Sequence, residues 1–340
     1  MSMLVVLWLL ALCQIVLVLV SPLFKSWQPF RWYYAAVFRP LFRQEEEYKW
    51  KYWLVPAFYT GIYIYCSFVF YVHVYGEIRS GLYTLEARCL PVVLALPLLS
   101  GYYTIVTSPH DTITYVGPEI PFDGIIFHDN IVCRSCRLKK AARSKHCSIC
   151  GRCILVADHH CVWLNNCIGL GNYQYFYLFL LSNCSMLSYA TIRLSSVAPS
   201  GLWRSNKSFL SLMILVCCFA VISISFTYMQ FALVRDGMTT NEKDKWYTIH
   251  KLMRNEQLLK LNNDCKFYIR IKNSPTPSSH TSTSTRTTHY QYEYYSTNPY
   301  DPKTYSLSDT SYHVVNSYQD IPNIYDRCSF WQNLKQRCVL

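Results

Sequence analysis

The sequence predicts an α-helical polytopic membrane protein that carries a compact module rich in cysteine and histidine. Its 340 residues are 51% hydrophobic and 15% charged, with 29 tyrosines and 9 tryptophans. This composition is too apolar and too aromatic for an ordinary soluble domain. Several apolar runs approach the length needed to cross a bilayer core of about 30 Å. Between two of these runs, residues 133–167 hold seven of the 16 cysteines and three of the ten histidines.

About five apolar runs are expected to cross the membrane as helices. The first contains Gln14 as its one strongly polar residue and has neither the basic start nor the cleavage site of a secretory signal, so we expect it to be retained. The third contains Pro91 and Pro97, which predict a kink. The five runs are Met3–Val20, Trp53–Tyr75, Cys89–Val106, Tyr175–Ile192 and Phe209–Val234.

The positive charge indicates membrane topology rather than a nucleic-acid partner. The net charge is +12, but the basic residues lie between and after the apolar runs. Of the 32 Lys and Arg residues, 27 fall on the side that holds the cysteine-rich loop and the C-terminal tail. The positive-inside rule therefore predicts a cytosolic loop and C-terminus and a lumenal N-terminus. The reducing cytosol favours metal thiolates over disulfides.

Four parts follow from this topology. The tail contains a segment of Ser, Thr and Pro, residues 274–288, that is too polar to form a core and is expected to be a disordered linker. The parts are residues 1–107 with three membrane helices, 108–172 with the cytosolic cysteine-rich domain, 173–234 with two membrane helices, and the cytosolic tail 235–340.

The cysteine-rich domain has the spacing of a two-zinc module. Ten candidate ligands would satisfy two tetrahedral zinc ions and leave two groups over. The count does not identify the spare pair, but the cluster Asp158-His159-His160-Cys161 suggests that it lies there, where a cysteine, a histidine and an aspartate could act as nucleophile, base and orienting group. The ten candidates are Cys133, Cys136, His146, Cys147, Cys150, Cys153, His159, His160, Cys161 and Cys167.

These residues resemble the cysteine-rich domain of the DHHC protein acyltransferases (palmitoyltransferases). The resemblance runs from Cys133 to Phe176 and departs from the family at Ala141, where a proline is usual. It implies two structural zinc ions that leave His159 and Cys161 free. The implied ligands are Cys133, Cys136, His146 and Cys153 for one ion, and Cys147, Cys150, His160 and Cys167 for the other.

The implied reaction is acyl transfer in two steps. Cys161 attacks the thioester of a long-chain acyl-CoA such as palmitoyl-CoA, and the acyl group then passes to a cysteine of a target protein. A free cysteine has a pKa of about 8.5 and needs activation, which His159 would supply with Asp158 holding its tautomer. A nearby basic patch either is a solvated or lipid-facing surface or contacts the phosphates of CoA. The patch comprises Arg137, Lys139, Lys140, Arg143 and Lys145.

Two further motifs lie in the tail. Thr239-Thr240-Asn241-Glu242 predicts a capping box at the start of a helix and also resembles the TTxE motif of the family. Asn323 and Tyr325 resemble its aromatic-containing C-terminal motif, or belong to a segment that docks on the cytosolic module. The helix after the capping box has an apolar stripe of Trp246, Ile249 and Met253.

The tail motifs resemble a fungal subfamily of five-span DHHC enzymes. That resemblance implies an endoplasmic-reticulum membrane and target cysteines beside the transmembrane segments of SNAREs. It also places Met186 where the acyl tunnel closes, although Met186 could equally pack between helices as flexible filler. The alternative function is a membrane-anchored zinc module that binds partners without catalysis.

Overall fold

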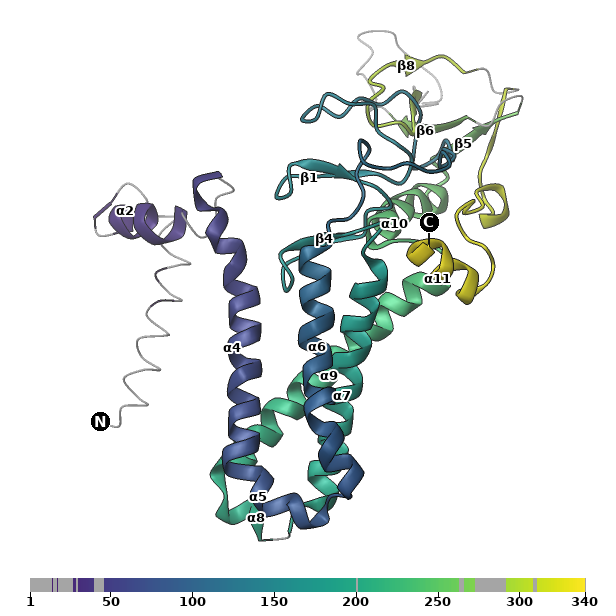
Figure 1. Ribbon diagram of the computed structural model, residues 1–340. Helices are drawn as coiled ribbons and strands as arrows, with labels where there is room; N and C mark the ends of the chain where they lie inside the picture. Colours follow the sequence, from purple (N-terminus) through teal and green to yellow (C-terminus); the bar gives the residue numbers. More distant parts are fainter. Residues whose placement is uncertain are drawn as a thin grey trace, which may run out of the picture. The chain divides into compact units, whose positions relative to one another are not determined.

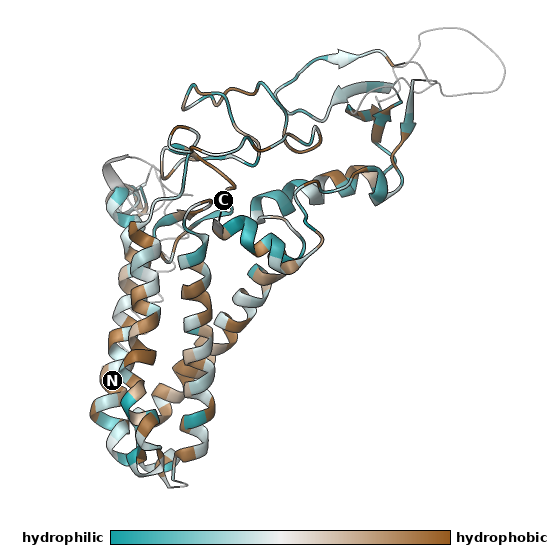
Figure 2. Ribbon diagram, turned by 45° about the vertical axis from the view of Figure 1, so that its right-hand side comes forward, coloured by the Kyte–Doolittle hydropathy of each residue, from teal (hydrophilic) through white to brown (hydrophobic). Residues whose placement is uncertain are grey.

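Three helices are long and apolar enough to cross a membrane within the ranges that the structure describes. The structure is a computed structural model, and it describes residues 14, 17, 27–28, 30–39, 46–199, 201–262, 266–272, 292–307 and 311–339. Hydrophobic residues gather along the long helices (Figure 2). The predicted first span and the predicted linker 274–288 lie outside these ranges, apart from two positions of the span. The three helices are Lys49–Gly81, Thr84–Val106 and Lys207–Arg235.

The first of the three contains the whole of the predicted span Trp53–Tyr75. Its middle, η3 (Phe70–Val74), is π-helical, which locally widens the helix. Before this helix come the short α2 (Phe30–Tyr33) and the π-helical η1 (Tyr34–Phe38). The other segments of the run are the 3₁₀ turn η2 (Glu46–Trp53), α4 (Leu54–Val69), α5 (Tyr75–Ile78) and the 3₁₀ turn η4 (Arg79–Gly81).

The other two apolar helices also agree with predicted spans. Helix α6 (Thr84–Val106) begins earlier than the predicted Cys89 and continues through Pro91 and Pro97. Helix α9 (Lys207–Arg235) follows the short α8 (Leu202–Ser205), and the side chain of Asn206 caps it by accepting a hydrogen bond from the backbone N–H of Phe209 at 3.0 Å.

Helix α7 (Tyr173–Val197) contains the predicted fourth span but is not among the three most apolar helices. It packs against both α6 and α9 (Figure 1). Its composition is more polar because part of its surface faces protein rather than lipid; buried Ser182 lies 3.2 Å from Ser100 of α6, oxygen to oxygen. Hydropathy alone therefore undervalues a helix that is enclosed by others.

Two short hairpins follow α6. Strands β1 (Lys145–Cys147) and β2 (Arg152–Ile154) pair antiparallel, as do β3 (His159–Cys161) and β4 (Asn166–Ile168). Helix α7 begins shortly after β4. The module predicted from its metal-ligand spacing is therefore built around two short β-hairpins.

The chain after α9 forms a helix, a sheet and a last helix, α11 (Phe330–Val339). Helix α10 (Thr240–Arg254) begins at the predicted capping box. The five-stranded antiparallel sheet, with strand order β8-β7-β6-β5-β9, was not predicted from the sequence, and a 3₁₀ turn η5 (Tyr318–Asp320) follows it. Its strands are β5 (Leu258–Leu261), β6 (Phe267–Lys272), β7 (Tyr292–Ser296), β8 (Thr304–Tyr305) and β9 (Tyr312–Val314).

The predicted apolar stripe of α10 lies in a hydrophobic core. Trp246, Ile249 and Met253 are all buried there, together with Tyr325. The same core includes Ile125–Phe127, from the segment before the first C-x-x-C pair. A segment that precedes α7 in the sequence and segments that follow α9 therefore share one core.

Candidate active site and metal centres

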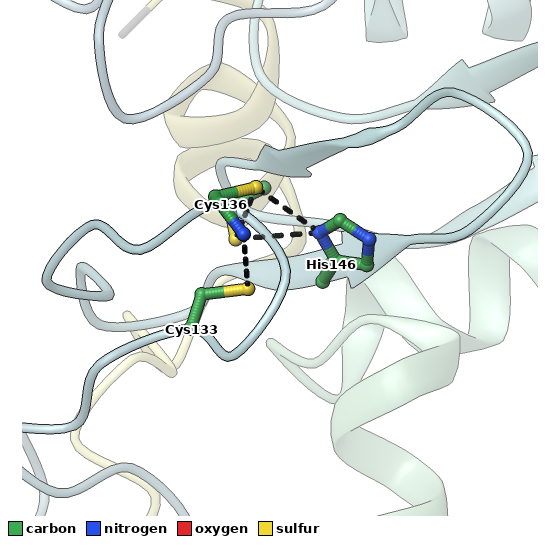
Figure 3. A group of neighbouring side chains, drawn as sticks. Cys133, Cys136 and His146 are labelled. Atoms are coloured by element: carbon green, nitrogen blue, oxygen red, sulfur yellow. Dashed lines mark hydrogen bonds between the residues drawn. The ribbon is translucent and has the colours of Figure 1, made fainter.

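The first group of metal-ligand residues lies around the β1–β2 hairpin. Antiparallel pairing sets His146 opposite Cys153, and the loop holding Cys133 and Cys136 lies against them (Figure 3). The Sγ of Cys136 lies 3.2 Å from Nδ1 of His146 and 3.8 Å from the Sγ of Cys153. Two sulfurs on one tetrahedral zinc would be about 3.8 Å apart, because each Zn–S bond is about 2.3 Å.

The second group lies around the β3–β4 hairpin. Pairing sets His160 opposite Cys167, and Nδ1 of His160 lies 3.4 Å from the Sγ of Cys150 and 3.6 Å from that of Cys167. Cys147 completes the group, with its sulfur 3.8 Å from the same nitrogen. In each of the two groups the four ligand atoms lie within 4.8 Å of one another, which is compatible with two zinc sites.

Burial and the close approach of the sulfurs make ionisation of Cys153 unfavourable without a counter-charge. Burial, helped by the neighbouring sulfurs of Cys133 and Cys136, raises the pKa of Cys153 to about 12. Several thiolates cannot hold negative charge at one point without a counter-charge. A divalent cation supplies that charge and makes deprotonated sulfur the stable form.

Strand alternation explains which residues remain outside both groups. Successive side chains of a strand point to opposite faces. In β3, His160 points to the second metal group, so His159 and Cys161 share the other face. This separation of a His–Cys pair from the ligands was expected from a ligand count and a resemblance, and the strand geometry supplies its physical cause.

Asp158 holds His159 in place. The Nδ1 of His159 lies 2.6 Å from a carboxylate oxygen of Asp158, whose side chain is completely buried. Thr240 donates two more hydrogen bonds to the carboxylate, from its backbone N–H at 2.7 Å and from its hydroxyl at 3.0 Å. The other ring nitrogen of His159, Nε2, is buried and makes no hydrogen bond with any residue that the structure describes.

The charges of this pair stabilise each other. Burial acts to raise the pKa of Asp158, but the hydrogen bonds and positive charge of its neighbours, His159 above all, outweigh it and bring that pKa below its ordinary value. Burial likewise acts to lower the pKa of His159, but Asp158 and the nearby Cys161 sulfur raise it to about 10. The arrangement therefore stabilises the proton that His159 takes up, because the imidazolium then lies between the Asp158 carboxylate and the Cys161 sulfur.

Aromatic rings from two membrane helices line the imidazole. The ring of Phe176 on α7 lies 5.6 Å from that of His159, centroid to centroid, and the ring of Phe226 on α9 lies 6.4 Å away. Both contacts are edge-on. The site is therefore apolar on the side of the helices, where a hydrocarbon chain could lie.

Two asparagines attach the β3–β4 hairpin to α6. The amide of Asn166 donates to the carbonyls of Thr104, Ile105 and Thr107, which have no partner within the helix because they lie at its C-terminal end. Asn172 donates to the carbonyls of Thr107 and Cys167. Both asparagines lie within the stretch that resembles the family, residues 133–176, but nothing in the sequence indicated this role.

The TTxE residues act as a second anchor. Thr239 and Glu242 form the predicted capping box, with bonds of 3.2 and 2.9 Å. Glu242 also makes a bidentate ion pair with Arg143, at 2.6 and 2.8 Å. Arg143 is 2% exposed, so its placement in a basic surface patch was wrong: it is a buried partner of Glu242.

The C-terminal aromatic motif packs onto the same anchor. The ring of Tyr325 lies 4.6 Å from the guanidinium carbon of Arg143, and its hydroxyl donates to the carbonyl of Pro121 at 2.9 Å. Asn323 donates weakly to the carbonyls of Asp236 and Gly237, at 3.4 and 3.5 Å. Met186 lies away from these contacts in sequence, buried on α7.

Residues 126–247 match the DHHC palmitoyltransferase family. The chain is 44% identical to "Palmitoyltransferase SWF1" of Eremothecium gossypii over 96% of this chain and 93% of that protein. It is 41% identical to the Saccharomyces cerevisiae protein of the same name, over 96% and 97% of the two chains. "Palmitoyltransferase ZDHHC4" of Bos taurus is 43% identical over 32% and 34%.

The family match spans the two metal groups, the Asp158–His159 pair and the TTxE anchor. With relatives above 40% identity over nearly the full length, the chain belongs to the DHHC palmitoyltransferase family of membrane-embedded protein S-acyltransferases.

Proposed function

We propose that the chain transfers palmitoyl groups through an S-acyl intermediate on Cys161, with His159 as the base and Asp158 as its orienting group. The supporting observation is the 2.6 Å contact between His159 Nδ1 and buried Asp158, which leaves Nε2 available on the strand that carries Cys161. A base whose Nδ1 is held in this way can accept and return a proton at Nε2.

In the first step, the thiol proton of Cys161 passes to Nε2 of His159, and the thiolate attacks the carbonyl carbon of palmitoyl-CoA. A new carbon–sulfur bond forms to Cys161 as the bond to CoA breaks. The CoA sulfur leaves with the proton from His159. The charge of Asp158 stabilises the imidazolium throughout, because the two groups are in direct contact.

In the second step, a cysteine of the target protein gives its proton to His159 and attacks the acyl-enzyme. The acyl group moves to the target sulfur, and the thiolate of Cys161 recovers a proton from His159. The enzyme returns to its starting state, so neither step needs another reactant.

Two zinc ions are proposed as structural cofactors, held by the two groups of four ligands found around the hairpins. When bound, each would close a tetrahedron and fix its hairpin, with no coordination position left for water. Cys161 then belongs to a strand that is held in place by His160 and by its partner Cys167 on β4.

The targets are proposed to be SNAREs and similar proteins with cysteines beside a transmembrane segment, at the endoplasmic-reticulum membrane. This rests on the resemblance of the tail motifs to a fungal subfamily and on the position of Cys161 close before α7. The same proposal puts the active site and C-terminus in the cytosol and the N-terminus in the lumen. Three of the five spans then lie before residue 107 and two lie between residues 172 and 234.

The test of catalysis is acylation of the purified protein by labelled palmitoyl-CoA, followed by release of the label with neutral hydroxylamine. The wild type and Cys328→Ser, which removes an exposed cysteine outside the module, should both carry hydroxylamine-sensitive label. Cys161→Ser should carry none. Bound zinc without label on the wild type would instead support the alternative of a non-catalytic zinc module.

The targets and the topology need separate measurements. A SNARE in vesicles should accept label on a cysteine beside its membrane segment, and moving that cysteine well away from the membrane should abolish transfer. In sealed microsomes, a tag after residue 340 should be cut by external protease, whereas a tag near residue 80 should be protected. Protection of the C-terminal tag would overturn the five-span arrangement.

A further inference from the structure

Helix α11 carries a buried cation far from the reacting residues in sequence. Arg337 is 2% exposed, and its guanidinium donates to the hydroxyl of Tyr177 at 2.8 Å and to the carbonyls of Leu233 and Met238 at 2.9 and 2.5 Å. It also lies over the ring of Tyr173, with its central carbon 5.6 Å from the centroid. A lysine cannot reproduce this planar set of contacts.

The contacts of Arg337 reach both segments that hold Asp158. On one side, Met238 directly precedes Thr239 and Thr240, and Thr240 donates two hydrogen bonds to the Asp158 carboxylate. On the other side, the hydroxyl of Tyr173 donates to the carbonyl of Val156, two residues before Asp158, at 2.9 Å. Arg337 therefore supports the Asp158 carboxylate through two separate chains of contacts, one through Met238 and Thr240 and one through Tyr173, and makes no direct contact with it.

The turn before Thr239 depends on the same region of the tail. Gly237 has a φ of +61°, and a Cβ there would lie 2.6 Å from the Cα of Asp326. Asp326 in turn accepts a hydrogen bond at 2.8 Å from buried Asn333, which lies one helical turn before Arg337. The buried face of α11 is thus polar, and its hydrogen bonds help to fix this turn.

The hydrogen bonds of Arg337 within the described residues go to a phenol and two carbonyls and to no carboxylate. Its positive charge is left to interact at longer range, and Asp158 is among the groups with which it interacts. Burying this charge without a carboxylate in direct contact is costly, so the polar groups around the guanidinium must offset that cost.

We propose that Arg337 is a positioning residue for acyl transfer, which acts through Thr240 and Tyr173 to hold Asp158, and through it His159, in the reactive geometry. This inference rests on the proposed roles of Asp158 and His159. It assigns a function in the reaction to the last helix of the chain, beyond the residues of the DHHC, TTxE and aromatic motifs.

The test compares the single-turnover rate of acyl-enzyme formation in wild type, Arg337→Met and Arg337→Lys. Both variants should react roughly tenfold or more slowly, because a misplacement of about 1 Å can cost roughly 100-fold in rate. The palmitoyl-CoA concentration that gives half the maximal rate should change by less than about twofold, since the proposal leaves substrate binding untouched. Free guanidinium at millimolar concentration should partly restore the rate of Arg337→Met only.

The matched control is Lys335→Met, which removes an exposed cation from the same helix and should react like the wild type. A double-mutant cycle with Thr240→Val distinguishes positioning from a general packing defect. If Arg337 acts through Thr240, the double variant should be clearly faster than the product of the two single effects predicts. Independent, multiplying effects would overturn the proposal.

Zinc content and thermal unfolding are measured on every variant. If the rate of Arg337→Met falls only in proportion to the amount of folded, zinc-loaded protein, the result would count against positioning. If Arg337→Met does not fold, Tyr177→Phe removes a single acceptor and takes its place in the cycle. An unchanged rate with an active wild type refutes the role of Arg337 alone, whereas an inactive wild type would refute the proposed function itself.

Discussion

Arg143 and Glu242, 99 positions apart in the sequence, form a bidentate ion pair in which both side chains are almost completely buried. The pair joins the loop of the metal-ligand module to the helix that follows the last membrane span. Because Glu242 also completes the capping box of α10, one carboxylate serves the local helix and the long-range contact.

Removing one partner of this pair should destabilise the protein strongly. Glu242→Gln leaves the Arg143 charge buried and uncompensated, with an expected loss of about 3–5 kcal/mol. The measurement is thermal unfolding in detergent, with zinc content recorded in parallel. Asp236→Asn, which breaks the exposed pair with Arg235, is the control and should cost less than about 1 kcal/mol. Equal effects of the two substitutions would contradict the assigned importance of burial.

Loss of a metal ligand should be distinguishable from loss of the nucleophile. Cys147→Ala or His160→Ala should lower bound zinc below two ions per chain and destabilise the module, because metal binding and folding are coupled in small zinc domains. Cys161→Ser should retain both ions and only lose the acyl-enzyme. Metal analysis of the purified variants checks this, and full zinc in Cys147→Ala would show that the ligand set is wrong.

Lys245 should make stability depend on pH. Its ammonium donates to the carbonyl of Ile126 at 3.2 Å and lies 3.8 Å from the centroid of the Phe127 ring. Burial, together with the charge of Lys140, lowers its pKa to about 8. Between that value and an unfolded pKa of about 10.4, the unfolded chain binds more protons than the folded one, so stability should rise with pH across this window.

The contribution of Lys245 is isolated by comparison with Lys245→Met. The stability difference between wild type and variant should shift in favour of the wild type by about 2–3 kcal/mol from pH 7.5 to 10.5. Unfolding midpoints at several pH values measure this shift. Lys243→Met, which removes an exposed lysine from the same helix, should track the wild type, and a parallel course for all three proteins would refute the prediction.

Met186 is predicted to limit the length of the acyl chain. It is buried on α7, thirteen residues after the helix begins at Tyr173, or roughly 20 Å along the axis. Met186→Ala should favour longer acyl-CoAs by a few-fold per added carbon until the new space is filled, since each buried methylene contributes about 0.8 kcal/mol. Acyl-enzyme formation with a series of acyl-CoAs measures this. An unchanged length profile would mean that Met186 only packs between helices.

Features encoded by nearby residues were predictable from the sequence. The capping box at Thr239 and Glu242 depends on two residues three apart, and the structure contains it. The structure also brings together the same two groups of four ligands that the family resemblance implied. Three membrane helices follow from runs of apolar residues, because length and composition are local properties.

Features that depend on tertiary contacts were not predictable. Nothing near Arg143 in the sequence indicates that its partner is Glu242, so a buried arginine was placed with surface lysines. The sheet of the tail was missed because its strands are only two to six residues long, too short to show a clear alternation of polar and apolar residues. The proposed role of Arg337 could not be predicted for the same reason, since its acceptors lie far away in the sequence, on α7 and at the end of α9.

The alternation of side chains along β3 decides which of its residues reach the metal group and which are left for the chemistry. His159 and Cys161 face one way and His160 the other, and the pairing of His160 with Cys167 sets which way that is. A slip of one residue would turn every side chain of the strand to the opposite face. Inserting one residue into β3 would then send reacting groups to the metal and the metal ligand to the substrate, so catalysis and zinc binding would fail together. The order of these three residues along the strand is therefore fixed by the two different tasks of its faces.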